Sequence, residues 1–127
     1  MSRVGRILAA ALLGTIQLSA CAPASITGAA PKAVVEHPLA PYGMHEECVE
    51  LKPGDRLDYT FDSTEPVEFN IHYHEGNAVA MPVVREKSRG DAGVFAPPLA
   101  HHYCLMWEAG AAGALLDYRM RLRPAGP

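Results

Sequence analysis

The feature that most constrains this chain is a strict alternation of apolar and polar residues in several short segments. In residues 56–62, Leu57, Tyr59 and Phe61 occupy every second position, and charged or polar residues stand between them. A period of two places successive side chains on opposite faces of a β-strand. One face of this segment is therefore predicted to pack in a core and the other to face solvent.

The same alternation recurs along the chain between turn residues. We expect strands at residues 46–51, 56–62, 67–73, 78–86, 101–108 and 116–122. The breaks between them are a type II turn at residues 52–55, a turn at 63–66, a polar loop at 87–93 and the turn of a final hairpin at 109–113. Because no amphipathic helix accompanies these strands, the chain is predicted to be all-β, a small antiparallel β-sandwich of about six to eight strands.

The first 20 residues form a separate unit. Arg3 and Arg6 precede a mostly apolar run at residues 7–18, and small residues precede Cys21. This is the layout of a secretory signal, and an apolar run of about 12 residues is too short to span a bilayer. Residues 1–20 are therefore predicted to be a signal peptide.

The end of that segment indicates how the chain is anchored. Leu18, Ser19, Ala20 and Cys21 resemble the lipobox of bacterial lipoproteins. The resemblance implies cleavage before Cys21, acylation of that cysteine with chains such as palmitate, and firm attachment to a membrane. Ala22, rather than Asp, follows the cysteine, which under the Asp retention rule implies the periplasmic side of the outer membrane; a host without that rule leaves the membrane open.

The rest of the chain is expected to contain a tether and one domain. Residues 21–42 are rich in Ala, Pro, Ser, Gly and Thr, which is typical of a flexible linker, and the domain is predicted at residues 43–124. The formal net charge of −3 becomes more negative once Arg3 and Arg6 are removed with the signal. A surface of that sign argues against nucleic acid as a partner.

The chain has three cysteines. Lipidation of Cys21 leaves Cys48 and Cys104 as a pair, and the signal directs the chain to an oxidising compartment. A disulfide between them is predicted, with a free reactive thiol at Cys104 as the alternative.

Several segments also follow the order of a known family. They are Glu47 to Glu50, the Pro53 and Gly54 turn, Val67 to Tyr73, and Tyr103 to Glu108. Together they resemble a GOLD domain, the lumenal β-sandwich of secretory cargo receptors and some lipid-transfer proteins. In cargo-receptor GOLD domains the disulfide occupies the places of Cys48 and Cys104. The resemblance implies a non-enzymatic module that binds a protein or a lipid.

Histidines give the chain a second candidate function. His72 and His74 are two apart on a predicted strand, so their imidazoles lie on one face about 7 Å apart and can converge on one metal ion. A third ligand from His102, or from His101, would complete a site for zinc or copper. The alternative is that these side chains are solvated on the polar face of the strand.

The sequence offers little for catalysis. It has no serine elbow, no phosphate-binding glycine loop followed by a helix, and no HExxH pattern. No histidine follows Cys104, which argues against a blue-copper centre. We therefore expect a non-enzymatic protein without a resident cofactor, unless the histidines hold zinc or copper.

Overall fold

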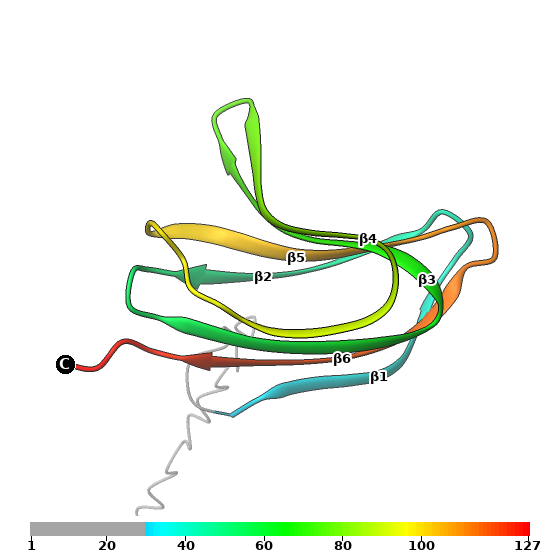
Figure 1. Cartoon of the computed structure of the whole chain (residues 1–127), viewed down its shortest axis with the longest axis horizontal. Helices are drawn as coiled ribbons and strands as arrows, with labels where there is room; N and C mark the ends of the chain where they lie inside the picture. The colour runs from blue at the N-terminus through cyan, green and yellow to red at the C-terminus, as the bar shows by residue number, and fades with distance from the viewer. Residues whose placement is uncertain (1–29) are drawn as a thin grey trace, which may run out of the picture.

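The computed structural model describes residues 30–127, and all of their regular structure is β-strand (Figure 1). The strands are β1 (Lys32–Leu39), β2 (Met44–Leu51), β3 (Arg56–Glu75), β4 (Ala78–Phe95), β5 (His101–Ala109) and β6 (Ala114–Arg123). They pair antiparallel in one six-stranded sheet, which confirms the predicted all-β class. No helix in this part of the chain is long and apolar enough to cross a membrane.

The sheet curls around the long hairpin of β3 and β4. Residues 56–63 of β3 pair with β6, whereas residues 67–72 pair with β5, and β4 follows β3 along both parts. The pairing register of β3 with β4 shifts between Asp62 and Val67, and there the ribbon bends (Figure 1). We call β1, β6 and the adjoining parts of β3 and β4 the first layer, and β2, β5 and the remaining parts the second layer.

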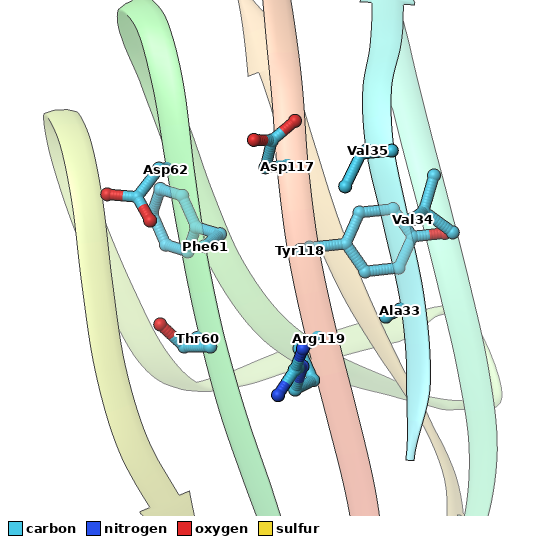
Figure 2. A pocket seen from close by; sticks show the side chains of 9 residues that line it. All are labelled: Ala33, Val34, Val35, Thr60, Phe61, Asp62, Asp117, Tyr118 and Arg119. Carbon is cyan, nitrogen blue, oxygen red and sulfur yellow. The ribbon is translucent and has the colours of Figure 1, made fainter.

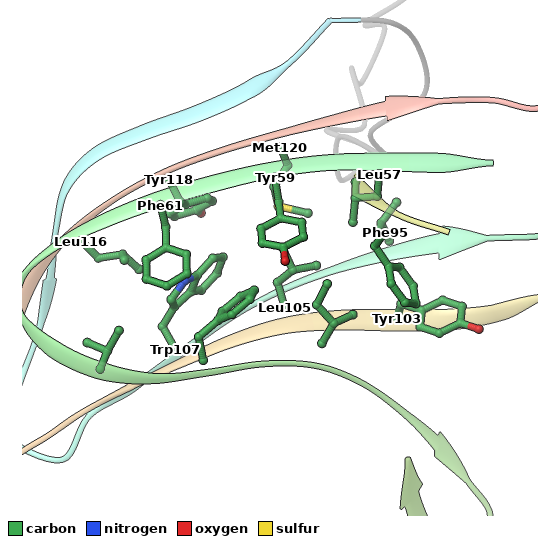
Figure 3. Close-up of a cluster of buried hydrophobic side chains, with 14 of the residues drawn as sticks. Leu57, Tyr59, Phe61, Phe95, Tyr103, Leu105, Trp107, Leu116, Tyr118 and Met120 are labelled. Carbon is green, nitrogen blue, oxygen red and sulfur yellow. The ribbon is translucent and has the colours of Figure 1, made fainter. Parts of the chain in front are cut away.

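The two layers enclose an aromatic core (Figure 3). Phe61 of the first layer lies with its ring centroid 4.8 Å from that of Phe69 and 6.1 Å from that of Trp107, both in the second layer. The largest fully buried side chains are Leu57, Phe61, Val67, Phe69, Ile71, Tyr103, Leu105, Trp107, Leu116 and Met120. Burying each such side chain contributes roughly 1.5–3 kcal/mol. The apolar phase of the predicted strands therefore forms the core.

Two predicted breaks are strand in the structure. Residues 63–66 lie inside β3, and residues 87–93 lie inside β4. The predictions of a turn and a polar loop were wrong because β3 and β4 remain paired on both sides of an irregularity, with Asp62 opposite Gly90 and Val67 opposite Ser88. β4 pairs only with β3, so polar side chains on this edge strand remain in contact with solvent.

The predicted final hairpin is also wrong in its pairing. β5 pairs with β2 and β3, β6 pairs with β1 and β3, and β5 and β6 do not pair with each other. The turn between them crosses from the second layer to the first. Gly113 has a φ of +66° there, and an added Cβ would lie 2.6 Å from the carbonyl oxygen of Leu39.

The turn predicted at residues 52–55 is present. Gly54 has the expected positive φ, and the N–H of Asp55 donates a hydrogen bond of 3.0 Å to the carbonyl oxygen of Lys52.

The domain begins earlier than predicted. β1 lies within the segment expected to be a tether, with Val34 partly buried and Leu39 buried. Its Pro38 is tolerated because β1 is an edge strand that pairs only with β6. A register shift between Val34 and His37, with Glu36 at a φ of 53°, interrupts the simple alternation that would mark a strand. The signal peptide, Cys21 and the first part of the tether lie outside the described residues.

Candidate functional site

A disulfide lies on the outer face of the second layer. Cys48 of β2 and Cys104 of β5 are direct register partners, and they are bonded with an S–S distance of 2.02 Å. Cys48 is exposed and Cys104 is buried. The predicted pairing is confirmed, and the alternative of a free thiol at Cys104 is excluded in this state. The bond links neighbouring strands of one layer and does not connect the two layers.

His72 of β3 lies next to Cys104, so Cys48, Cys104 and His72 form a row of side chains across β2, β5 and β3. It is the register partner of Cys104, and it is only 4% exposed. Its Nδ1 lies 2.8 Å from Asn70 Oδ1, and its Nε2 lies 3.5 Å from Glu46 Oε1. Burial lowers the pKa of His72 below 6.5; Glu46 opposes this and His74 adds to it, so the imidazole is mostly neutral at pH 7.

The other predicted ligands surround this row. His74 is exposed, and its ring centroid lies 5.3 Å from that of His72. His102 is also exposed, and its Nδ1 lies 2.8 Å from Glu50 Oε1. The alternative of solvated histidines therefore fits His74 but not the buried His72. His101 lies instead against the ring of Tyr73, with centroids 4.8 Å apart.

One group of possible metal ligands is compact. Among residues 30–127, the single set of three or more His, Cys, Asp or Glu ligand atoms that all lie within 4.8 Å of one another belongs to Cys48, His102 and Cys104. We call these residues the Cys/His trio. His72 and His74 are not part of it, so a metal site formed by His72, His74 and His102 stays a prediction.

A second polar cluster lies between the layers, and the sequence analysis did not predict it. His45 Nε2 lies 2.9 Å from the Tyr118 hydroxyl, and the His45 ring centroid lies 4.0 Å from that of His37. Close by, Lys32 of β1 forms a salt bridge with Glu47 of β2. These contacts join the outermost strands of the two layers. The signal was present in the sequence, because His45 and Glu47 continue the inward phase of the buried Val49 in β2.

Burial and neighbouring charges keep His45 and Tyr118, the hydrogen-bonded pair of this cluster, in their neutral forms. Burial lowers the pKa of His45 below 6.5, and the neighbouring His37 lowers it further. Burial raises the pKa of Tyr118 to about 12, and Glu47 adds to the effect. At pH 7 the pair is therefore mostly a neutral imidazole beside a neutral phenol.

An open groove lies on the outer face of the first layer (Figure 2). It has a volume of about 210 Å³ and is lined by Ala33, Val34, Val35, Thr60, Phe61, Asp62, Asp117, Tyr118 and Arg119. We call it the β6 groove. Val35 on its rim is 72% exposed. Asp62 and Asp117 face each other as register partners, while Arg119 provides the opposite charge further along β6. The groove thus combines an exposed apolar contact with charges of both signs.

The chain matches no protein-family model, and no curated protein is significantly similar to it.

Proposed function

We propose that the protein is a lipoprotein of the bacterial envelope, anchored through acylated Cys21, whose β-sandwich is a non-enzymatic module for binding another envelope protein or a lipid. The lipobox and the resemblance to GOLD domains support the class of protein. The β6 groove is the observation that supports a binding role for the domain.

The composition of the groove favours a protein segment over an acyl chain. Val35 offers an apolar contact, but Asp117 and Arg119 beside it would be desolvated by a hydrocarbon chain without compensation. An extended peptide can satisfy such charges with its own side chains and main chain. β1 is also an edge strand, so its outer edge can pair with an added strand.

Site-specific photo-crosslinking in the native envelope tests this proposal. A photoreactive residue at Val35 is expected to yield a defined adduct, which mass spectrometry identifies. Val84, 48% exposed on β4 and outside the groove, is the matched control and should yield none. The purified partner should then bind the native protein and bind the Val35→Glu variant at least about tenfold more weakly, because the substitution removes an apolar contact and buries an unpaired charge in its place. Equal adducts from both positions, or equal affinities, would contradict the proposal.

The anchor has its own test. In cells fed labelled palmitate, the Cys21→Ser variant is expected to accumulate as unprocessed precursor without label, while the native chain is labelled. Labelling of the variant at the native level would rule out lipidation at Cys21, whatever the groove binds.

A second proposal is metal binding by His72, His74 and His102. The edge-to-face contact of the His72 and His74 rings, 5.3 Å apart, supports it. Zinc or copper measured after purification should be stoichiometric in the native protein and lost in a His72→Ala, His74→Ala variant. Metal-free native protein that does not take up either ion would refute it.

A further inference from the structure

The Cys/His trio combines features that the binding proposals leave unused. Cys48 is exposed, so a reductant can reach the disulfide. His102 stands beside both sulfur atoms, with its side chain 56% exposed. Exposed disulfides are more easily reduced than buried structural ones. Reduction would therefore give two free thiols next to an imidazole.

We propose that the reduced protein binds one zinc ion through Cys48 Sγ, Cys104 Sγ and the imidazole of His102. A dithiol reductant supplies the two electrons. The S–S bond breaks, the reductant closes its own disulfide, and its two protons pass to the two cysteine sulfurs. Zinc then replaces these protons, so binding releases two protons and leaves two zinc–thiolate bonds.

The geometry requires only local movement. Zinc–sulfur bonds of about 2.3 Å at a tetrahedral angle place two sulfurs about 3.8 Å apart. The sulfurs are 2.02 Å apart in the disulfide, and a ring nitrogen of His102 already lies within 4.8 Å of both. Side-chain rotation on two paired strands can open this distance while β2 and β5 keep their register. The exposure of Cys48 and His102 leaves the fourth position to water.

Glu50 strengthens the assignment of His102 as a ligand. Its Oε1 lies 2.8 Å from His102 Nδ1, which leaves Nε2 as the free ring nitrogen. A carboxylate that holds the other nitrogen of a ligating histidine is a common feature of zinc sites, and its loss typically lowers affinity about 10–100-fold. Oxidation removes both thiolates, so the disulfide form lacks the site.

This inference does not rest on anchoring or on a partner in the β6 groove. It also differs from the three-histidine proposal, because it needs reduction and does not use His72 or His74. The three-histidine site should bind metal with or without a reductant, whereas the Cys/His trio should bind it only after reduction.

The test uses the full chain in detergent with Cys21→Ser, so that only the pair of interest can supply thiols. After phosphine reduction, the protein should bind one zinc ion in competition with a chromophoric chelator. Cobalt as a stand-in should give sulfur-to-metal charge-transfer absorption. His102→Ala should weaken zinc binding at least about tenfold and Glu50→Gln about 10–100-fold. His101→Ala and His74→Ala are the matched controls and should bind as the native chain does.

Three results would overturn the proposal. Zinc affinity could be the same before and after reduction, or unchanged in His102→Ala. The reduced chain could also lose its β-sheet circular dichroism and fail to regain it with zinc, which would remove the scaffold for the site. Folded, reduced protein with one zinc ion that depends on His102 supports it.

Discussion

The position of the disulfide predicts how much stability it contributes. Cys48 and Cys104 are 56 residues apart, and the loop between them contains all of β3 and β4. In the chain-entropy description, cross-linking a loop of this length restricts the unfolded chain by about 4 kcal/mol at 25 °C. Replacing both cysteines by Ala should therefore lower the free energy of unfolding by up to about 4 kcal/mol, a large share of the roughly 5–15 kcal/mol typical of a folded domain.

Urea denaturation of the Cys21→Ser chain, followed by tryptophan fluorescence, measures this loss. The matched control is Glu46→Ala with Met106→Ala, the register pair next to the disulfide on the same two strands. A noncovalent cross-strand pair contributes only about 0.2–1 kcal/mol. If the Cys48→Ala, Cys104→Ala variant lost no more than this control, the bond would not restrict the unfolded chain as we argue.

Three further predictions concern the core, the turn between the layers and the response to acid. Phe61→Ala should lower the free energy of unfolding by about 3–5 kcal/mol in the same assay, because Phe61 is buried between the two layers; a loss below 1 kcal/mol would contradict that packing. Gly113→Ala should cost more than about 1 kcal/mol, since φ is +66° and a Cβ would meet backbone, whereas Gly110→Ala, with open space around it, should cost less. Because burial lowers the folded-state pKa of both His45 and His72 below 6.5, the unfolded chain binds more protons below that pH, and stability should fall as the pH drops below 6.5. Urea midpoints at pH 7.5 and 5 should differ less in a His45→Gln, His72→Gln variant, and an unchanged difference would count against the buried histidines as its source.

The sequence predicted which face of each strand is buried better than it predicted which strands pair. Alternation in residues 56–62 identifies which side chains point inward, because a period of two is a property of a single strand. It carries no information on which strand lies alongside. β5 and β6 are consecutive and joined by a tight turn, yet each pairs with β3 from opposite layers. That arrangement depends on the curl of the whole sheet, which no local pattern encodes.

Strand β1 and the cluster around His45 were both missed by the sequence analysis, for related reasons. β1 contains Pro38 and a register shift at residues 34–37, which an edge strand tolerates and a simple alternation does not show. Without β1, the sequence gives no reason to place His37 and Lys32 beside the inward-facing His45 and Glu47. For His72 the outward phase was predicted correctly, but its burial depends on how Asn70 and Glu46 lie beside it. Cys48 and Cys104 were predictable because few alternatives remained for two cysteines in an oxidising compartment.

The two proposed sites lie on opposite outer faces, and this separation leads to a last prediction. The β6 groove is on the first layer and the Cys/His trio is on the second, with the aromatic core between them. Packed sheets stand about 10 Å apart, and substitutions at that distance without shared partners usually add within about 0.5 kcal/mol. Partner affinity should therefore be the same in the oxidised, the reduced and the zinc-bound protein. A shift greater than about threefold would show that the layers respond together, and the contact of Trp107 with Tyr118, whose ring centroids are 4.8 Å apart, would be the first place to test for that coupling.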